Sequence, residues 1–373
     1  MKKKVLILST YQGHASIARA VRQALEKANY AVNIYEQEDP SIHLYRLIYR
    51  HKPEFFKHLY NVGKLKSSRI ISKMFLKQNY DAKIKELLEK HKPDLIITTF
   101  FIYLPSLELN KSVHQPIINI IVNPRDVLDI ELSSKITANC AFDDKQMRMI
   151  KKNNVKYNNI LKTGWFVRDE FEESYSKSKV REKLKLDQKK PTFLFTSGSE
   201  GTNAIIANII LLLKSRKECQ IIVACGTNEI LFKGIKALKP MAVKGVQKII
   251  PIAFTTKLYQ YMQAADLVIG KAGPNSVFEC VATKTPFFAT THISGQEDGN
   301  LEIIKSYKLG YVEEEPTKAI KLMEKILDHP EVLNEFKPAL KLLADQNKAA
   351  KKKLREIVKE ALSSPLSSPS PLK

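Results

Sequence analysis

Short runs of β-branched and other apolar residues alternate along this chain with amphipathic stretches that have the period of a helix. The first apolar run, Val5–Leu8, precedes an amphipathic stretch from Ile17 to Lys27, and a second run follows at Ala31–Tyr35. Further runs occupy Leu95–Thr98 and Ile117–Val122, each after a helical segment. This β-α-β alternation predicts a parallel, doubly wound sheet.

A second series of the same kind begins after the polar, charged segment from Glu172 to Lys190. Two such sheets in tandem form a cleft between them, and open α/β sheets bind ligands at the carboxyl ends of their strands. We therefore expect the active site between two domains. The strands predicted for the second sheet are Thr192–Thr196, Gln220–Ala224, Val246–Ile250, Leu267–Ile269 and Phe287–Thr290.

These patterns divide the chain into a first domain over residues 1–168, a linker over 169–190 and a second domain over 191–330. The pattern over 331–362 is helical and rich in lysine, and helices at this place are expected to pack back on the first domain. The tail over 363–373 consists mainly of serine and proline, so we expect it to be disordered.

The composition is that of a globular protein with a basic excess. Of its 373 residues 44% are apolar, so each of two domains can bury a core. The formal net charge is +22, but most of the cations are lysine rather than arginine, whose bidentate fork suits bases and phosphates. The charge therefore favours attraction to an anionic membrane, and we expect no nucleic-acid partner.

Cys140, Cys219, Cys225 and Cys280 are far apart, and none belongs to a C-x-x-C pair. They are typical of reduced, buried residues in a cytosolic protein. The charged start is followed by only four apolar residues, which indicates a first strand rather than a signal peptide. No apolar stretch reaches the roughly 18 residues that a membrane span needs. We expect a cytoplasmic protein that associates peripherally with the cytoplasmic face of the membrane.

The most informative stretch is the strand and turn that follow Ala264. A buried strand ends at Gly270, a tight Gly/Pro turn follows, and a helix is expected to begin near Asn275 or Ser276. Free backbone N–H groups at the start of a helix bind anions. The Ser276 hydroxyl can add to such a site, and Glu279 can reach back to a ribose diol. A helix cap without a ligand is the alternative.

Two other loops have residues that suit a sugar nucleotide. In the loop over 294–300, Gln296 and Glu297 offer an amide and a carboxylate to a polyhydroxylated sugar. The loop over 196–202 joins the first strand of the second domain to a helix, and its small residues let backbone amides approach a phosphate. Loops of either kind also occur where nothing binds.

These residues carry a resemblance to a known family. The run from Gly270 to Glu279, followed by the run from Gly295 to Asn300 and by Gly310, resembles the donor-site motif of glycosyltransferase family 28. That family includes the monogalactosyldiacylglycerol synthases and the processive diacylglycerol glucosyltransferases. The likeness extends over nearly the whole chain to about residue 330.

Two further segments are similar to motifs of this family. The segment over 163–171 resembles its interdomain Gly-x-Pro-Val-Arg-x-x-Phe motif, with Phe166 in place of the proline. The segment over 9–18 resembles its amino-terminal Gly-His loop, with Gly13 alone where relatives have two or three glycines. The run from Asn123 to Asp126 stands where relatives have a Thr-Asp-containing strand end.

The resemblance implies an α/β protein with the GT-B fold, in which two Rossmann-like doubly wound parallel-sheet domains have a cleft between them. It implies that a UDP-sugar is the donor substrate, that Glu279 binds its ribose, and that Ser276 and nearby amides bind its diphosphate. Gln296 and Glu297 would bind the sugar hydroxyls, and the loop over 251–255 would meet the uracil. The implied UDP-sugar site comprises Gly198, Ser199, Phe254, Gly273, Pro274, Asn275, Ser276, Glu279, Gln296, Glu297 and Asn300.

The resemblance also implies two catalytic residues. Arg168 would stabilise the diphosphate leaving group as it gains negative charge. His14, after the first strand, would act on the acceptor side as general base, although a structural hydrogen bond is the alternative for a histidine in this position. The sequence has no Asp-x-Asp motif, so we expect no metal and no cofactor. The expected chemistry is a single displacement with inversion at the anomeric carbon.

Cations and aromatic residues interleave between His43 and Tyr80, where Glu54 is the only carboxylate after Leu44. Aromatic rings favour the headgroup boundary, and anionic lipid attracts each Lys or Arg by about 1 kcal/mol. We expect this segment to bind the membrane and the lipid acceptor, although such a composition also suits single-stranded nucleic acid. The residues concerned are Tyr45, Arg46, Tyr49, Arg50, Phe55, Phe56, Lys57 and Tyr60.

The function implied is an inverting, metal-independent transferase that moves a hexose from a UDP-sugar to a lipid acceptor, with diacylglycerol expected, at the cytoplasmic membrane face. One alternative is a UDP-sugar transferase with a polyprenyl-linked or soluble acceptor. Another is a nucleotide-sugar-binding protein without turnover. The first loop lacks Gly-x-Gly-x-x-Gly, which disfavours a nicotinamide dehydrogenase. The identity of the sugar, processivity and oligomeric state stay open.

Overall fold

The computed structural model of the chain describes residues 2–11, 13–37, 66–152, 158–196, 198, 204–215, 217–238 and 246–363. These residues form two compact units. The first unit contains the chain up to Asp169, the short segment Ser294–Gln296, and the chain from Gln346 onward. The second unit contains Glu170–Ile293 and Glu297–Asp345.

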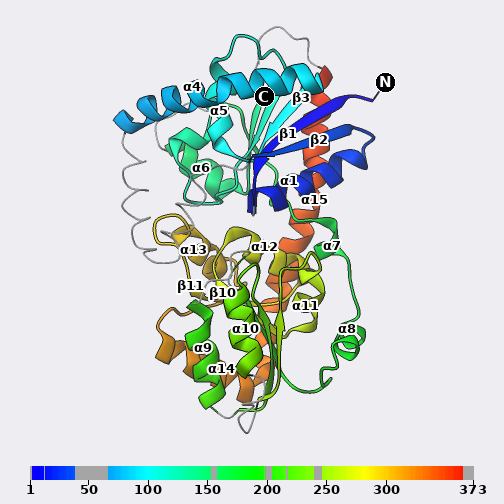
Figure 1. Cartoon of the computed structure of the whole chain (residues 1–373), viewed down its shortest axis with the longest axis vertical. Coiled ribbons are helices and arrows are strands. Elements are labelled where there is room, and N and C mark those ends of the chain that lie inside the picture. The colour runs from blue at the N-terminus through cyan, green and yellow to red at the C-terminus, as the bar shows by residue number, and fades with distance from the viewer. Residues whose placement is uncertain are drawn as a thin grey trace. The chain divides into compact units, whose positions relative to one another are not determined.

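The first unit is built on a six-stranded parallel sheet with the strand order β2-β1-β3-β4-β5-β6 (Figure 1). Its strands are β1 (Lys4–Thr10), β2 (Ala31–Gln37), β3 (Leu95–Thr98), β4 (Ile117–Ile120), β5 (Ala138–Ala141) and β6 (Ile160–Lys162). Its helical elements are α1 (Gly13–Glu26), α4 (Lys66–His91), η1 (Phe101–Tyr103), α5 (Leu104–Leu109), η2 (Asp129–Glu131) and α6 (Asp144–Lys152).

Helices pack on this sheet through the alternation of its side chains. Successive residues of a strand face opposite sides, and Leu6 and Leu8 of β1 belong to the cluster that contains Ile84 and Leu87 of α4. Helix α1 packs on β1 and β2 with its buried apolar stripe. The core of the unit therefore forms from alternate strand residues and one face of each helix.

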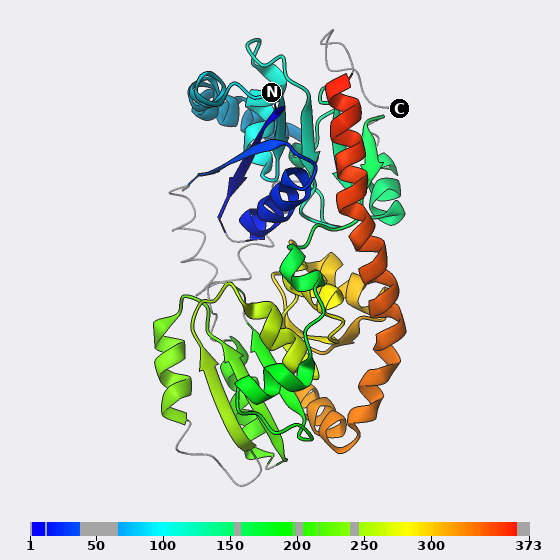
Figure 2. The same ribbon diagram turned by 90° about the vertical axis from the view of Figure 1, so that its right-hand side faces the viewer.

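The second half of α15 (Lys337–Ser363) belongs to the first unit (Figure 2). The Asn347 Oδ1 atom accepts a hydrogen bond of 3.0 Å from the backbone N–H of Trp165. The Lys351 ammonium pairs with one oxygen of the Asp169 carboxylate, and Lys27 of α1 pairs with the other at 2.6 Å. These contacts tie the helix to the end of the first unit's chain. The tail over 364–373 lies outside the described residues.

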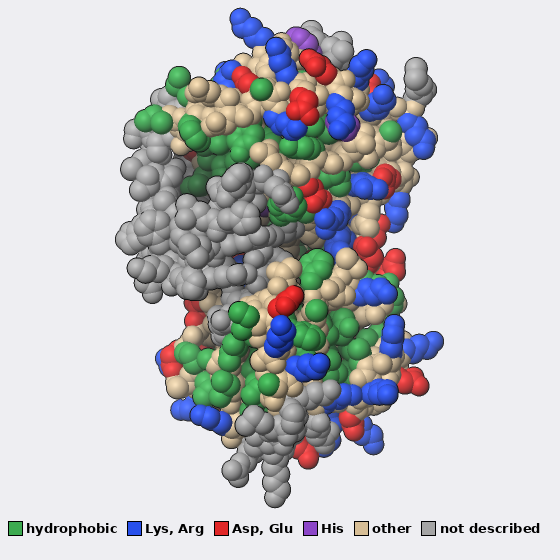
Figure 3. Space-filling view, viewed as in Figure 1, with side chains coloured by type: hydrophobic (Ala, Val, Ile, Leu, Met, Phe, Trp, Pro, Cys, Tyr) green, Lys and Arg blue, Asp and Glu red, His purple; other side chains and the backbone are tan. Residues whose placement is uncertain are grey.

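One turn of α4 exposes a group of large apolar side chains. Ile71, Met74 and Phe75 are 70%, 67% and 65% exposed, and Figure 3 shows hydrophobic side chains on the surface of the first unit at the start of this helix. Their i, i+3 and i+4 spacing puts them on one face. Lys73 on the same turn pairs with Glu108 of α5 at 2.9 Å, which holds this part of α4 against the unit.

The second unit has its own six-stranded parallel sheet with the order β12-β11-β10-β7-β8-β9. Its strands are β7 (Thr192–Thr196), β8 (Cys219–Ala224), β9 (Val246–Ile252), β10 (Leu267–Lys271), β11 (Phe287–Thr291) and β12 (Gly310–Val312). Its helical elements are α7 (Asp169–Glu172), α8 (Lys177–Lys183), α9 (Ala204–Lys214), α10 (Glu229–Leu238), α11 (Leu258–Ala264), α12 (Pro274–Thr283), α13 (Asp298–Ser306), α14 (Pro316–Asp328), η4 (Pro330–Phe336) and the first half of α15.

Two glycines allow strands of this sheet to lie close together. A Cβ atom on Gly270 would lie 1.8 Å from the carbonyl oxygen of Thr196 in β7. A Cβ atom on Gly310 would lie 1.9 Å from the carbonyl oxygen of Phe287, and Gly310 also has a φ of +151°. Both glycines are therefore required by strand pairing, whatever the sheet binds.

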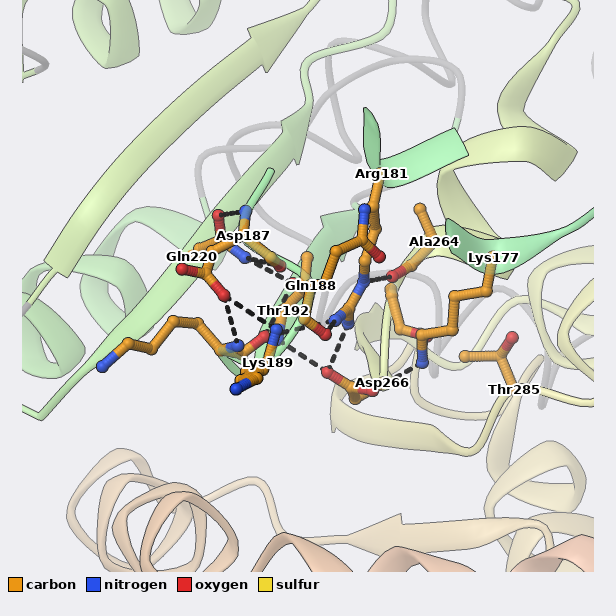
Figure 4. A network of polar contacts seen from close by, with 12 residues as sticks. Lys177, Arg181, Asp187, Gln188, Lys189, Thr192, Gln220, Ala264, Asp266 and Thr285 are labelled. Carbon is orange, nitrogen blue, oxygen red and sulfur yellow. Dashed lines mark hydrogen bonds and ion pairs between the residues drawn. The ribbon is translucent and has the colours of Figure 1, made fainter. Parts of the chain in front are cut away.

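The segment over 169–190, which we expected to be a linker, is packed into the second unit from residue 170 onward. Arg181 is 4% exposed, and its guanidinium donates to the carbonyl oxygens of Ala264, Gln188 and Lys190 and to the Asp266 carboxylate (Figure 4). Lys177 binds the other oxygen of that carboxylate. The cations that make the segment polar in sequence bind it to Ala264 and Asp266 of the second unit, a role that a linker would not have.

The prediction of two doubly wound parallel sheets is confirmed, and all nine predicted strands are present within two or three residues of their expected ends. Three short strands, β5, β6 and β12, were not predicted, because none contains an apolar run longer than two residues. In β5, Asn139 interrupts the apolar pattern, yet it is buried and pairs with Asn119 at 3.0 Å and Asn159 at 3.1 Å. A buried polar ladder of this kind is stable because each amide is satisfied by the next.

We predict that Gly270→Ala destabilises the protein by about 3 kcal/mol or more, because the new methyl group forces β10 away from the Thr196 carbonyl. The measurement is urea unfolding of the full chain. Gly234→Ala in α10 is the matched control, since its Cβ would meet no atom within 4 Å, and it should stabilise by about 0.5–1 kcal/mol. Equal stabilities for the two variants would contradict the prediction.

Candidate active site

Each sheet has one place where the order of its strands reverses. In the second unit the chain runs from β7 through β8 to β9 in one direction, and from β10 through β11 to β12 in the other. The reversal lies between β7 and β10, which pair along residues 193–196 and 267–270. Open parallel sheets bind ligands beyond the carboxyl ends of the strands at such a point. A ligand is therefore expected at the turn that follows β10 and at the turn that follows β7.

Helix α12 is separated from the end of β10 by two residues (Figure 1). The backbone amides at its start are free. Its N-cap is Gly273, which has no side chain, and no described side chain caps the helix. Pro274 occupies the first helical position and has no N–H, and the N–H of Val277 donates to the Gly273 carbonyl at 3.1 Å. The amides of Asn275 and Ser276 thus point out of the helix start, where partial positive charge favours an anion.

We expected this helix to begin near Asn275 or Ser276, with a helix cap without a ligand as the alternative. The helix begins one residue earlier, at Pro274. Proline is favoured at the first helical position because its fixed φ suits a helix and its missing N–H is no loss there. Asn275 and Ser276 consequently lie inside the first turn, half-buried, and the cap position falls on glycine.

A buried ion pair lies against this helix start. Lys271, the last residue of β10, pairs with the Glu297 carboxylate, and a Cβ atom on Gly273 would lie 3.2 Å from the lysine nitrogen. The two side chains are 15% and 5% exposed. The pair therefore puts a cation next to the free amides of α12. Lys271 was not predicted as a site residue. Its position as the last strand residue before a Gly/Pro turn and a helix start could have indicated a cation beside an anion site.

Two predicted sugar ligands, Glu297 and Asn300, have protein partners for their side chains. The second oxygen of the Glu297 carboxylate accepts the backbone N–H of Ile293 at 2.8 Å. Asn300 donates from Nδ2 to the Ala272 carbonyl at 2.8 Å. Both side chains are buried. They join α13 and the residue before it to the turn before α12, so they fix the position of that turn.

The other predicted donor residues lie along the same edge of the second sheet or in its loops. Gly198 follows β7 with a φ of +77° and open space at its Cβ position, while Ser199 lies outside the described residues. Phe254 follows β9 and is 60% exposed. Glu279 is half-buried in the second turn of α12. Gln296 is half-buried in the loop between β11 and α13 and is grouped with the first unit.

In the first unit the order of strands reverses between β1 and β3, and His14 lies at this point. Its Nδ1 atom is 2.6 Å from the carbonyl oxygen of Thr99, which follows β3. A carbonyl only accepts, so Nδ1 carries the proton and Nε2 of the neutral ring keeps its lone pair. The ring contacts Phe100 with centroids 4.8 Å apart. Burial lowers the pKa of His14, although the Thr99 carbonyl opposes the shift. A neutral imidazole with a basic Nε2 is the form that a general base requires.

A second buried polar group supports the loop after β4. The Arg125 guanidinium makes two hydrogen bonds to the Asp143 carboxylate, at 2.9 and 2.7 Å. Asn123 donates to Glu131 at 2.8 Å, and burial raises the pKa of that carboxyl to about 8, so it is protonated at neutral pH. The run from Asn123 to Asp126, which departs from the family pattern, thus forms part of the buried frame of the first unit.

Arg168, the second predicted catalytic residue, lies in the first unit between β6 and Asp169. It is half-buried, and the three residues before it, Trp165–Val167, are buried. Phe166, in the position of the family's proline, is 4% exposed. The motif therefore contributes apolar side chains to the core and leaves the arginine nearer the surface.

The eight residues predicted to bind the acceptor and the membrane, from Tyr45 to Tyr60, lie outside the described residues. Among the described residues, no group of three His, Cys, Asp or Glu side chains is arranged to hold a metal ion. No helix in the described part of the chain combines the length and the apolar character of a membrane span.

Solved structures share this architecture. The chain aligns with MurG of Acinetobacter baumannii at a TM-score of 0.60 and 14% identity, over 96% of this chain and 100% of that one. It aligns with UDP-GlcNAc 2-epimerase from Neisseria meningitidis bound to UDP-GlcNAc at 0.64 and 14% identity, over 95% and 100%. An S. aureus MnaA–UDP structure aligns at 0.62 and 11% identity, over the full length of both. At these identities the likeness shows the fold alone.

Curated relatives match over most of the chain. A processive diacylglycerol beta-glucosyltransferase of Bacillus licheniformis is 24% identical over 357 residues, 91% of each protein. The enzyme of the same name from Staphylococcus haemolyticus is 25% identical over 88% of this chain and 85% of its own length. That from Bacillus subtilis is 22% identical over 96% of both.

Two family models divide the chain between them. The model of monogalactosyldiacylglycerol (MGDG) synthase matches residues 14–167, which contain His14 and the first sheet. The model of the glycosyltransferase family 28 C-terminal domain matches residues 192–361, which contain the second sheet and the start of α12. The first half of the chain thus matches the MGDG synthases, and the second half matches the C-terminal domain of glycosyltransferase family 28.

Proposed function

We propose that this protein transfers a hexose from a UDP-sugar to a hydroxyl group of a lipid, with diacylglycerol as the acceptor. The names of the curated relatives support this acceptor, and the UDP and UDP-GlcNAc in structures of the same fold support the donor. Within this chain one observation carries the proposal. The uncapped start of α12 and the Lys271 cation lie together at the switch point of the second sheet.

In the proposed complex the diphosphate binds the amides of Asn275 and Ser276, with the Ser276 hydroxyl beside them. Glu279 binds the ribose, Gln296 binds sugar hydroxyls, and the loop that contains Phe254 meets the uracil. The partial positive charge of the helix start and the Lys271 ammonium neutralise the diphosphate, so the reaction needs no metal ion.

The proposed reaction is one displacement at the anomeric carbon. Nε2 of His14 takes the proton of the attacking hydroxyl, while the Thr99 carbonyl holds Nδ1–H and fixes the tautomer. The hydroxyl oxygen forms the new glycosidic bond as the bond to UDP breaks, and the configuration inverts. The negative charge that develops on UDP is stabilised by the α12 amides, Lys271 and Arg168.

We also propose that the protein works on the cytoplasmic face of an anionic membrane. The exposed apolar side chains of α4, Ile71, Met74 and Phe75, suit insertion at the headgroup boundary. The net charge of +22 attracts the chain to that surface. The acceptor would enter the protein from the membrane beside this helix.

The proposed function is tested by incubating the full chain with UDP-glucose, UDP-galactose or UDP-GlcNAc and anionic vesicles that contain diacylglycerol. Glycosylated diacylglycerol together with released UDP is the expected result. Turnover only with a polyprenyl phosphate or a soluble acceptor would overturn the acceptor assignment. Binding of UDP without turnover on any acceptor would identify a nucleotide-sugar-binding protein instead.

His14→Ala should lower kcat by about 10²–10⁴-fold, the usual contribution of a general base, and leave the Kd for UDP unchanged. At saturating UDP-sugar, the acid-side fall of the wild-type kcat should lie below pH 6.5, because the pKa of His14 is lowered and the ring stays neutral down to that point. Exposed His114→Ala is the control. Turnover of His14→Ala at the wild-type rate would show that the base is another group.

Lys271→Met should weaken UDP binding by roughly 10- to 100-fold, the equivalent of a charge-assisted hydrogen bond of about 1.5–3 kcal/mol. Isothermal titration with UDP measures the change. The substitution leaves Glu297 buried without its cation, so the double variant Lys271→Met/Glu297→Gln is measured too and should bind equally weakly. Lys305→Met, an exposed position of α13, is the control. Wild-type affinity for UDP in the double variant would show that Lys271 does not contribute to UDP binding.

Met74→Glu/Phe75→Glu should reduce co-sedimentation with anionic vesicles by about tenfold or more, since two exposed apolar side chains are lost to the bilayer. Leu342→Glu is the matched control, because Leu342 is 63% exposed on another helix, α15. Unchanged vesicle binding by the double variant would exclude this face of α4 as the docking surface.

A further inference from the structure

A histidine that the sequence analysis did not consider lies between two carboxylates at the end of β11. The Nδ1 atom of His292 is 2.6 Å from Oε1 of Glu314, and its Nε2 atom is 2.8 Å from Oδ1 of Asp298. The imidazole is 15% exposed, whereas the two carboxylates are 37% and 56% exposed. A single ring thus links the end of β11, the first residue of α13 and the segment between β12 and α14.

These contacts determine the protonation state of the ring. Ionised carboxylates only accept hydrogen bonds, so both ring nitrogens must donate, which requires the imidazolium form. Burial alone would lower the pKa of His292, but Glu314 and Asp298 outweigh it and raise the pKa. The geometry and the raised pKa therefore favour the imidazolium, which donates from both nitrogens.

His292 and Asp298, which contact each other, are the first and last residues of the loop over 292–298. Other residues of this loop contact the candidate donor site. At the start of the loop, the N–H of Ile293 binds the Glu297 carboxylate, and the N–H of Glu297 binds the Ile293 carbonyl, each at 2.8 Å. The same Glu297 carboxylate holds Lys271 against Gly273 at the start of α12. The position of the imidazolium and the position of the anion-binding turn are thus coupled through one carboxylate.

We infer that His292 is a positioning residue, which as an imidazolium holds the donor loop in the arrangement that binds the UDP-sugar. This inference rests on the proposed function, since it assigns a role to a loop of the same site. The charged groups paired with the ring are Asp298 of α13 and Glu314 of the segment after β12, and the Lys271–Glu297 pair contacts the same loop through the N–H of Ile293.

Loss of the ring proton has two consequences for the donor. A neutral imidazole has one N–H, so a lone pair then faces one of the carboxylates, and that contact becomes repulsive. The loop also gains negative charge close to a site for an anion. Because the pKa of His292 is raised in the folded protein, the stabilisation is fully present below the ordinary histidine pKa and is lost as pH rises through the folded pKa. Donor affinity should therefore fall with rising pH.

The experiment measures the Kd for UDP by isothermal titration between pH 6 and pH 9 with the full chain. At pH 6 the wild type should bind UDP about fivefold or more tightly than His292→Gln, the lower end of ordinary coupling between sites. At pH 9 the two proteins should bind UDP about equally. His292→Arg, a permanent cation, should retain affinity at pH 9.

His329→Gln is the matched control, because His329 is exposed and pairs with Glu331 alone at 3.3 Å. It should follow the wild-type profile, and the titration of UDP itself cancels when variants are compared at the same pH. A merely structural ion pair would change the unfolding temperature of His292→Gln and leave the pH dependence of UDP binding as in the control, which would overturn the inference. If the wild type binds UDP at no pH, the proposed function fails instead.

A direct measurement covers the case in which His292→Gln does not fold. NMR titration of the labelled imidazole should give His292 a pKa above 6.5 in the wild type. That pKa should fall in Asp298→Asn and in Glu314→Gln, and the pH at which UDP affinity declines should fall with it. A shifted imidazole pKa with an unshifted UDP profile would overturn the inference.

Discussion

The parallel pairing of strands is the constraint on which the rest of this structure depends. In each sheet all strands end at one edge, so residues far apart in sequence meet there, as His14 and Thr99 do in the first unit and Lys271 and Glu297 in the second. The pairing itself needs close approach of the backbones, which Gly270 permits by leaving room for a carbonyl of β7. The main-chain amides that begin α12 open onto the same edge, because each helix of a parallel sheet starts where a strand has just ended.

The candidate donor site consists of an outer layer and a supporting layer. Free amides at the start of α12 and the half-buried Ser276 and Glu279 form the outer layer. Beneath it, buried Glu297 and Asn300 connect α13 to the turn that holds those amides. A buried charge is tolerated only when it is paired and its remaining lone pairs are satisfied, and the Glu297 carboxylate meets that condition through Lys271 and a backbone N–H. In this structure Glu297 therefore holds the loop before α13 to the end of β10.

The first unit uses buried polar groups in a different way. An Asn ladder runs from β4 through β5 to the residue before β6, and the Arg125 guanidinium makes two hydrogen bonds to Asp143. Such networks define one arrangement of the loops above a sheet, because each unpaired member would be costly. The reversal point of this sheet holds a neutral histidine against a carbonyl, whereas that of the second sheet holds a cation and free amides. The two halves of the chain thus share an architecture. At the reversal point the first sheet offers a proton acceptor, whereas the second offers groups that bind an anion.

Much of this protein was determined by local sequence. The alternation of apolar runs with helical periods predicts both sheets, and the turn from Gly270 to Ser276 indicates an anion site, since strand burial and helix starts depend on neighbouring residues. Short strands such as β5 escaped the pattern, because the partners that satisfy Asn139 are about 20 residues away on either side. Tertiary structure alone decided that Gly273 occupies the N-cap position of α12, that Arg181 fastens the segment after residue 170 to the second unit, and that His292 lies between Asp298 and Glu314. The reason is physical: the protonation and the role of a buried polar group are set by the groups that fold against it, and those come from other parts of the chain.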